Sequence, residues 1–419
     1  MELRDTQNLF KYKPINEVLN QIIEKSKIQM NVLEIPTIKS YGFILAEDIK
    51  ANKNIPPFDV SHFDGYAVNS KDLASASITN PVLLRIVGKS DHKESFEGTL
   101  KSMETVYTTT GAKVPNGADS IIPLERVRAK DDGYIEVYSP VKSRDHITPM
   151  GSDIKEGEII LKLNHVIRPQ DVKVLLELNI LSVKVYKKPS VGILSVGDEL
   201  TNCIEEIHQK KLETHSLILS KMIEGSMGIP YNVGIVQDDP KLIANKVSLC
   251  LEKFDIVVTI GGLSLGIRDV TYKAVSNLKP CDLLVRGIRV QPGRVSSVAI
   301  IKGKPIIMLP GHIQSMFSGA FFLLLPLLKY LNHLPLTPFI KLKAVMGEEL
   351  IVKEWIPFKR VRFVKLESIG DKYIAKPILG DSSMISVLVK SDGFIIIPEG
   401  LEIIKKGSEV DVHLFPYPC

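Results

Sequence analysis

The sequence has few cysteines and little excess charge. Its four cysteines, Cys203, Cys250, Cys281 and Cys419, lie far apart and form no Cys-x-x-Cys pair, which disfavours a disulfide framework and a structural zinc site. With 53 basic and 48 acidic residues, the formal net charge is +5. This excess is too small for a protein that coats a polyanion, so we expect no nucleic-acid partner.

Long apolar runs are also missing. The longest strongly apolar stretch, Met316 to Leu328, contains Ser318, Gly319 and Pro326 and is shorter than the roughly 20 residues that a membrane-spanning helix needs. The N-terminus, Met-Glu-Leu-Arg-Asp, does not have the charged and then apolar pattern of a signal peptide. We therefore expect a cytoplasmic protein without membrane contact.

Several common motifs of enzyme active sites do not occur in the sequence. There is no Gly-x-x-x-x-Gly-Lys-Ser/Thr and no Gly-x-Gly-x-x-Gly after a predicted strand, which disfavours a P-loop kinase and a standard Rossmann dehydrogenase. There is likewise no His-Glu-x-x-His and no Gly-x-Ser-x-Gly. Zinc peptidase and α/β-hydrolase chemistry therefore have no support.

The length of 419 residues predicts several domains. Apolar residues at helical spacing predict amphipathic helices over residues 14–29 and 169–178. Between them, short β-runs and turn clusters predict a β-rich module. We therefore expect a discontinuous helical base domain at 1–47 and 148–187, interrupted by an inserted β-rich domain at 48–147.

The second half of the chain predicts an α/β domain at 188–332 and a C-terminal β domain at 333–419. Short apolar runs alternate with helix-like segments; the runs are 191–196, 231–236, 255–260 and 305–309, and the segments are 214–226, 240–253, 269–277 and 312–330. This alternation predicts a parallel sheet buried on both faces. The predicted fold is multi-domain α/β plus β, with a parallel-sheet α/β domain, a helical base, a β-rich insert and a small barrel-like C-terminal domain.

Polar residues follow each predicted strand of the α/β domain, at the edge where open parallel sheets bind ligands. They are Gly197-Asp198-Glu199-Leu200, Gln237-Asp238-Asp239-Pro240, Gly261-Gly262-Leu263-Ser264-Leu265-Gly266 and Pro310-Gly311-His312. A Gly-rich turn before a helix binds anions through backbone N–H groups. Glu199, Asp238 and Asp269 are carboxylates of the kind that hold Mg²⁺ beside a phosphate. The cluster therefore predicts a phosphate-and-metal site.

Each of these elements also has a structural interpretation when it is taken alone. Asp239 and Pro240 are typical of a helix start, and Gly261 and Gly262 are typical of a tight turn. In the turn-rich segment 56–68, Asp59 and Asp64 are typical of acids that make turn hydrogen bonds in a loop that enters a strand. A binding site is favoured because the four loops that follow the predicted strands lie together at one edge of the sheet.

Segment 56–68, Pro-Pro-Phe-Asp-Val-Ser-His-Phe-Asp-Gly-Tyr-Ala-Val, closely resembles the signature of the MoeA family of molybdopterin molybdenumtransferases. Gephyrin and the plant Cnx protein carry a related domain. Further matches occur in order: Thr110-Gly111-Ala112, Pro115, Gly117-Ala118-Asp119, Gly151 with Asp153, Gly197 to Leu200, Asp238 to Pro240, Gly261 to Asp269, Pro292-Gly293-Arg294 and Leu309-Pro310-Gly311. The resemblance therefore covers nearly the whole chain.

The resemblance implies a homodimer in which the α/β domain binds molybdopterin nucleotide and the β-insert of the partner subunit completes the site. It implies an enzyme that hydrolyses adenylylated molybdopterin, inserts molybdate or tungstate at the dithiolene and releases AMP, with the help of Mg²⁺. A molybdopterin adenylyltransferase is a candidate partner. Either oxyanion fits the resemblance.

The resemblance also implies a role for each matching residue. Asp64, Thr110 and Asp153 would face the site as catalytic residues from the insert side. Glu199, Asp238 and Asp269 would act around metal and phosphate, with Glu199 and Asp269 also catalytic. The residues that would hold the substrate are Gly261, Gly262, Ser264, Gly266, Arg289, Gly293, Arg294, Pro310, Gly311 and Ser383.

Arginines are the candidates for binding the oxyanion, because guanidinium and hydroxyl groups donate to such ions. Arg289 and Arg294, and Arg360 with Ser383, are the residues in question. For Arg289 and Arg360, a solvated strand face is an equally good interpretation.

The chain departs from the family pattern mainly at cationic positions. Gln291 and Arg294 stand where the family has lysines, and Arg is not an equivalent donor to Lys. His312 replaces the Asn of Leu-Pro-Gly-Asn-Pro, and Glu213-Thr214-His215 resembles the family's Asp-Thr-Asn. These changes keep an alternative open, a non-catalytic paralogue that binds pterin or a partner as a scaffold. A generic nucleotide hydrolase would leave segment 56–68 unexplained.

Overall fold

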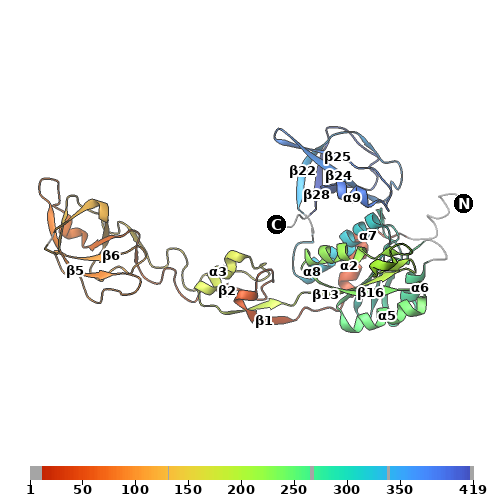
Figure 1. The fold of residues 1–419 in the computed structure, drawn as a ribbon, viewed down its shortest axis with the longest axis horizontal. Coiled ribbons are helices and arrows are strands. Elements are labelled where there is room, and N and C mark those ends of the chain that lie inside the picture. The colour runs from red at the N-terminus through yellow and green to blue at the C-terminus, as the bar shows by residue number, and fades with distance from the viewer. Residues whose placement is uncertain (1–11, 131, 265–268, 337–339, 416–419) are drawn as a thin grey trace. The chain divides into compact units, whose positions relative to one another are not determined.

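The computed structural model of the protein describes residues 12–130, 132–264, 269–336 and 340–415. The chain divides into two compact units, and the helices and strands of both are labelled in Figure 1. Unit 1 comprises residues 1–35, 42–46 and 184–419, and unit 2 comprises residues 36–41 and 47–183. Each unit has its own hydrophobic core.

A six-stranded sheet forms the centre of unit 1. In order across the sheet, its strands are β16 (Ile229–Val236), β13 (Ser190–Val196), β17 (Ile256–Ile260), β21 (Lys304–Leu309), β20 (Ser297–Ile301) and β18 (Cys281–Val285). The first four are parallel, as predicted. The last two, which were not predicted, pair antiparallel. Because β20 is antiparallel to β21 and β18 is antiparallel to β20, β18 runs in the same direction as β21. Its carboxyl end therefore lies at the same edge as those of the parallel strands.

Helices cover both faces of this sheet (Figure 1). One face packs against α2 (Ile15–Lys25), α4 (His215–Glu224), α7 (Ile313–Gly319) and α8 (Leu325–Leu331), and the other against α5 (Pro240–Lys253) and α6 (Val270–Ser276). Successive strand residues alternate between the two cores: Ile193 belongs to the first and Leu194 to the second. Burial on both faces explains the continuous apolar runs of the sequence.

Among the described residues, one helical segment, Ile313–Leu331, is long and apolar enough to cross a membrane by length and composition. Within its most apolar window, 89% is buried inside the fold, and its side chains belong to the core of unit 1. The segment was predicted as one helix. It consists of α7, a π-helical turn η5 (Ala320–Leu324) and α8, which has Pro326 in its first turn. A wider turn accommodates a proline that lacks an N–H donor.

The C-terminal part of unit 1 is a closed five-stranded barrel, as predicted. Its order is β24 (Lys359–Ile369), β25 (Lys372–Pro377), β22 (Lys341–Met346), β28 (Glu409–Leu414) and β26 (Gly393–Ile397), and a β24–β26 pairing closes it. The smaller elements nearby are β19 (Val290–Gln291), β23 (Leu350–Ile351), β27 (Ile403–Ile404) and α9 (Ile385–Lys390).

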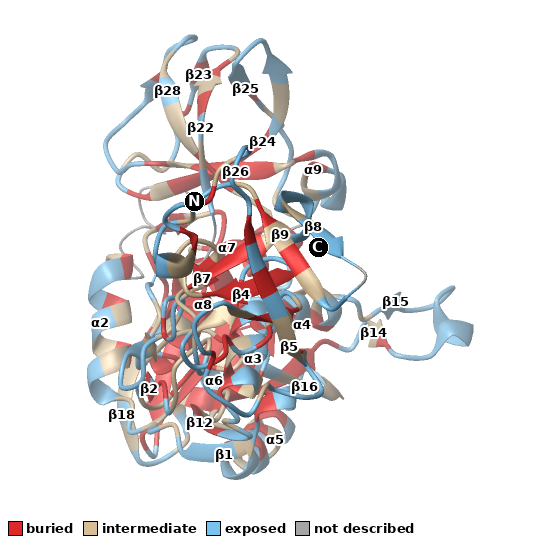
Figure 2. Ribbon diagram, turned by 90° about the vertical axis from the view of Figure 1, so that its left-hand side faces the viewer, coloured by how far each residue is buried: buried red, intermediate tan, exposed pale blue. Residues whose placement is uncertain are grey.

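Unit 2 contains the predicted β-rich insert. Its six-stranded sheet has the order β7 (Ser120–Pro123), β4 (Gly65–Val68), β6 (Glu104–Thr108), β5 (Val82–Ser90), β9 (Tyr134–Val137) and β8 (Val127–Lys130). Strand β4, which ends the signature segment, is buried along its whole length (Figure 2). The other elements are β2 (Ile49–Lys50), β3 (Val60–Ser61), β10 (Ile147–Thr148), β11 (Ile159–Leu161), α3 (Pro169–Glu177), η1 (Thr37–Lys39), η2 (Ser70–Leu73) and η3 (Leu124–Arg126).

Helix α2 packs in a different domain from the one that we predicted. We assigned it to the helical base, but Ile15, Val18 and Ile22 pack in the core under the α/β sheet. The division into four domains otherwise stays a prediction. The remaining short elements are β1 (Val32–Pro36), β12 (Ser182–Tyr186), β14 (Leu200–Thr201), β15 (Lys211–Leu212) and η4 (Ile204–Glu206).

Candidate functional site

A cavity of about 360 Å³ lies at the carboxyl ends of the four parallel strands of unit 1. The predicted residues that line it are Glu199, Asp238, Gly261, Gly262, Ser264 and Gly311. They come from four loops that are far apart in the sequence and meet because their strands are parallel. We call this the carboxylate cavity.

The Gly261–Gly262 turn can be built only from glycine. Its φ angles are +99° and +64°, a Cβ at Gly261 would lie 2.3 Å from the carbonyl oxygen of Val196, and one at Gly262 would lie 2.2 Å from Thr271 Oγ1. The Gly261 N–H donates to the Leu309 carbonyl at 2.9 Å, and the Thr271 hydroxyl donates to the Gly261 carbonyl at 2.9 Å. This turn is therefore anchored to the sheet, and the Gly261 N–H is not available for an anion.

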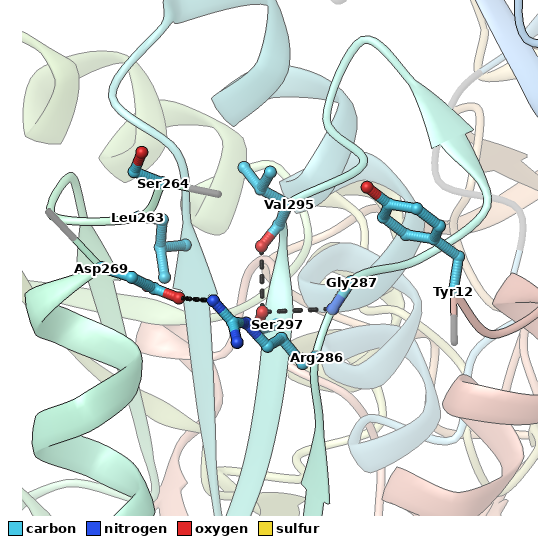
Figure 3. Close-up of a pocket in the computed structure, with 8 residues that line it drawn as sticks. All are labelled: Tyr12, Leu263, Ser264, Asp269, Arg286, Gly287, Val295 and Ser297. Carbon is cyan, nitrogen blue, oxygen red and sulfur yellow. Dashed lines mark hydrogen bonds and ion pairs between the residues drawn. The ribbon is translucent and has the colours of Figure 1, made fainter. Parts of the chain in front are cut away.

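Asp269 lies in a small adjoining cavity of about 10 Å³ (Figure 3), which has room for about one water. The residue is only 2% exposed, and its carboxylate forms an ion pair with Arg286. Burial raises the pKa of Asp269, while Arg286 and the backbone N–H groups of Ser264 and Tyr272 oppose the rise. The Arg286 guanidinium also lies 4.8 Å from the centroid of the Tyr272 ring. Asp269 is thus fixed on several sides.

The three carboxylates predicted for magnesium do not gather at one point. Glu199 and Asp238 line the carboxylate cavity, whereas Asp269 faces Arg286 in the smaller one. Nowhere in the described ranges are three His, Cys, Asp or Glu side chains grouped as they would be for a metal ion. Mg²⁺ commonly takes one or two carboxylates and completes its shell with water and substrate phosphates. Glu199 and Asp238 fit that arrangement.

A third cavity, of about 280 Å³, is lined by predicted residues of the Pro292-Gly293-Arg294 and Leu309-Pro310-Gly311 motifs. Gly293, Arg294, Pro310 and Gly311 line it, so we call it the arginine cavity. The Arg294 guanidinium lies 4.3 Å from the centroid of the Trp355 ring. Of the two neighbouring serines on the barrel side, Ser382 lines the arginine cavity, and the predicted Ser383 does not.

Arg360 and Arg289 have structural partners. Arg360 is 1% exposed, and its guanidinium donates to three carbonyl oxygens, those of Val352, Pro398 and Leu401, at 3.1, 2.9 and 2.5 Å. Arg289 Nε donates to the carbonyl of Tyr12 at 3.2 Å. The interpretation of Arg360 as part of a solvated strand face is therefore wrong. Its proposed role as an oxyanion ligand stays a prediction, and the three carbonyl contacts give its guanidinium a structural role instead.

Unit 2 brings together two of its three predicted residues. Asp64 Oδ1 accepts hydrogen bonds from the Thr110 N–H at 2.6 Å and from the Thr110 hydroxyl at 2.8 Å. These two donors lower the pKa of Asp64 below its usual value. Asp153 is exposed, and its N–H donates to the Ile55 carbonyl at 3.1 Å, next to the signature segment.

The structural interpretation of Asp239 is confirmed, because it caps α5 by accepting from the Lys241 and Leu242 N–H groups. The hydrogen bonds of Asp59 are not the local turn bonds that we predicted. Its carboxylate accepts from the distant Met150 N–H at 2.8 Å and from Arg144 at 2.5 Å. Asp59 therefore holds the loop that precedes Asp153.

Arg286 is the functional candidate that the sequence reasoning missed. It directly follows β18, whose strand end lies at the site edge. Its position after Cys281–Val285 is the signal that could have found it, but that edge strand is mostly half-exposed, so its sequence does not predict a buried strand. The predicted residue Gly266 lies outside the described residues.

Comparisons with known proteins match most of the chain. A family model described as the MoeA N-terminal region (domain I and II) matches residues 13–178, one described as a probable molybdopterin binding domain matches 192–330, and one described as the MoeA C-terminal region (domain IV) matches 357–415.

Relatives and solved structures agree with these matches. A protein of Methanocaldococcus jannaschii named for molybdopterin biosynthesis is 32% identical over 411 residues, which is 96% of each chain. The molybdopterin molybdenumtransferase of Bacillus subtilis is 27% identical and covers 96% of this chain and 94% of its own. The crystal structure of a molybdopterin biosynthesis MoeA protein from Pyrococcus horikoshii superposes with a TM-score of 0.84 at 30% identity and covers 97% of this chain and 100% of that chain.

Proposed function

Because this chain belongs to the MoeA family, we propose that it is a molybdopterin molybdenumtransferase of molybdenum cofactor biosynthesis. It inserts molybdate or tungstate into adenylylated molybdopterin and releases AMP. The observation that carries this proposal is the pair of cavities at one sheet edge. One is lined by Glu199 and Asp238, and the other by Arg294.

The residues of unit 1 suit the cleavage of a phosphoanhydride. Such a reaction depends on positioning and on neutralising charge more than on covalent catalysis. When bound, Mg²⁺ supplies positive charge beside the phosphates, and Glu199 and Asp238 are the side chains that would hold it. Ser264 lines both the carboxylate cavity and the small adjoining cavity that contains Asp269, so its hydroxyl can orient a phosphate at their border. The Asp269–Arg286 pair fixes the wall behind it.

We further propose a cytoplasmic homodimer whose sites are shared between subunits. Asp64, Thr110 and Asp153 of one subunit would then complete the site in unit 1 of the other. The paired Asp64 and Thr110 support this role, because an exposed carboxylate held by two donors is oriented before a ligand arrives. The substrate must come from a molybdopterin adenylyltransferase, which is the partner class we propose.

The test is AMP release by the purified chain from adenylylated molybdopterin, with Mg²⁺ and either molybdate or tungstate. We expect release that requires an oxyanion and stops when the cation is chelated. The double variant Glu199→Gln, Asp238→Asn should bind the pterin substrate but need far more Mg²⁺. Tight pterin binding without AMP release, with both oxyanions tried, would contradict the enzyme and support the scaffold.

A further inference from the structure

His312 lies at the border between the carboxylate cavity and the arginine cavity, and it lines both. It follows Gly311 at the end of β21 and is the residue before α7. The side chain is exposed. A single imidazole can therefore reach a ligand that occupies either cavity or spans the two.

The orientation of the His312 ring is set by the barrel. His312 Nδ1 lies 2.9 Å from Ser382 Oγ. Gln314 fixes the backbone on which Ser382 lies. Its N–H donates to the Ser382 carbonyl at 3.1 Å, and its Nε2 donates to the Asp381 carbonyl at 2.6 Å. When the Ser382 hydroxyl donates to Nδ1, the neutral ring carries its proton on Nε2. Nε2–H is then the donor left for a ligand.

His215 lies near the same loop. It is the first residue of α4 and lines the carboxylate cavity together with Gly311. Burial lowers the pKa of its imidazole, and Glu213 and the nearby Gly311 backbone oppose that change. Its Nε2 is buried without a hydrogen-bond partner among the described residues. The Gly311–His312 segment therefore lies between the His215 side of the carboxylate cavity and the Ser382 contact, and both neighbours limit the positions that the His312 ring can adopt.

The side chains on the two sides of this border carry opposite charges. Glu199, Glu213 and Asp238 bring negative charge to one side. On the other side, Arg294 is partly engaged by the Trp355 ring and by Gln291 Oε1 at 3.2 Å. The His312 N–H adds a donor beside the arginine, where an anionic oxygen is favoured, whereas the acids on the other side repel such an oxygen unless a cation is bound there.

We propose that His312 Nε2 holds an oxygen of a tetrahedral oxyanion at the border of the two cavities, with His215 as a positioning residue. The identity of the anion rests on the proposed function. Molybdate or tungstate and a phosphate of the nucleotide share this chemistry, and the experiment separates them.

The test compares variants that keep different halves of the imidazole. Asn reproduces the Nδ1 side, so His312→Asn keeps the Ser382 contact and loses the ligand-facing donor. Gln reaches the Nε2 position, so His312→Gln does the opposite. The control is His208→Asn, an exposed histidine outside the lining of both cavities. Equilibrium dialysis of the full chain measures the binding of molybdate alone and of inorganic phosphate alone.

We expect His312→Asn to weaken the binding of one anion about ten-fold, the effect of one lost hydrogen bond to a charged group. His312→Gln should stay within about three-fold of the wild type, and His208→Asn should match it. Loss for molybdate assigns the site to the metal oxyanion, and loss for phosphate assigns it to the nucleotide. Equal binding of both anions by the wild type and His312→Asn, or no binding by the wild type, would overturn the inference.

The positioning role of His215 has a separate readout. His215→Asn should raise the half-saturating oxyanion concentration a few-fold in the AMP-release assay and leave kcat unchanged, because the loop is loosened and no reacting group is lost. An effect on kcat alone would contradict it. Since dialysis needs no turnover, a wild type that binds anions through His312 but releases no AMP would refute only the proposed function.

Discussion

Asp64 in unit 2 and Asp269 in unit 1 were chosen by the same motif reasoning, yet they lie in opposite environments. Asp64 is exposed and accepts two hydrogen bonds from Thr110, which lower its pKa. Asp269 is buried, and burial raises its pKa in spite of Arg286. Two like side chains can take different roles when their environments move their pKa values apart.

The difference indicates how each carboxylate is kept in place. Neutral donors on one neighbouring loop hold Asp64, so it can meet a ligand without losing a counterion. Asp269 depends on Arg286, because a buried carboxylate without a partner is costly. Changes around Asp269 should therefore affect both activity and stability, whereas changes around Asp64 should affect mainly activity.

The largest expected effect is that of Asp269→Asn. The amide keeps the shape but removes the charge that Arg286 faces, so we expect AMP release to fall at least about 100-fold. The oligomeric mass, measured by light scattering, should not change. Asp371→Asn, an exposed acid in the β24–β25 hairpin, is the control and should keep wild-type turnover. Unchanged turnover in Asp269→Asn would remove this residue from the mechanism.

Arg286→Gln should destabilise unit 1 in a pH-dependent way. Without the arginine, the pKa of Asp269 rises further above its unfolded value. Stability is then lost as the pH rises from the unfolded pKa through the folded one. We expect a deficit of about 1–2 kcal/mol near neutral pH, since Arg286 is 36% exposed and the pair is partly screened. The deficit should vanish below about pH 4.

The free energy of unfolding of unit 1 is measured by urea unfolding, followed by the fluorescence of Trp355, the only tryptophan of the sequence. Arg286→Lys keeps the charge and should lose less stability. A deficit that is the same at acidic and neutral pH would show that the lost stability does not come from the ion pair.

The strand-end part of the site could be predicted from the sequence, and the Asp269–Arg286 pair could not. Parallel strands buried on both faces leave apolar runs, and the loops after those runs meet at one edge. Glu199, Asp238 and Gly261 were found in this way. Arg286 comes after an antiparallel edge strand whose residues are mostly half-exposed, so its sequence carries no such signal.

Arg360 shows a second limit of prediction. Its partners are carbonyl oxygens of residues 8 to 41 positions away in the sequence, and only the closed barrel brings them around it. An arginine in a β-run is usually exposed, because burial of its charge needs several well-placed acceptors. No local pattern reveals those acceptors. That this part of the chain is a small β-domain was predictable from its β-runs separated by turns, whereas its closure depends on the pairing of β24 with β26.

A smaller effect is expected of Thr110→Val, which removes the hydroxyl donor to Asp64 and keeps the backbone one. The pKa of Asp64 should move up toward its ordinary value, as carbon NMR of the carboxyl group can measure. AMP release should fall several-fold. The matched control is Thr109→Val, because the Thr109 hydroxyl is buried without a partner among the described residues and its loss should be neutral or stabilising. An unchanged pKa in Thr110→Val would contradict the role of the hydroxyl.

The smallest effect separates two neighbouring serines of unit 1. Ser382 lines the arginine cavity and contacts His312, whereas Ser383, the predicted residue, lies outside that lining. Ser382→Ala should raise the half-saturating molybdate concentration about two- to five-fold, because the His312 ring loses the bond that orients it. Ser383→Ala should have no effect. If Ser383→Ala has the larger effect, the family motif identifies the oxyanion ligand better than the cavity does, and His312 is not oriented by the barrel.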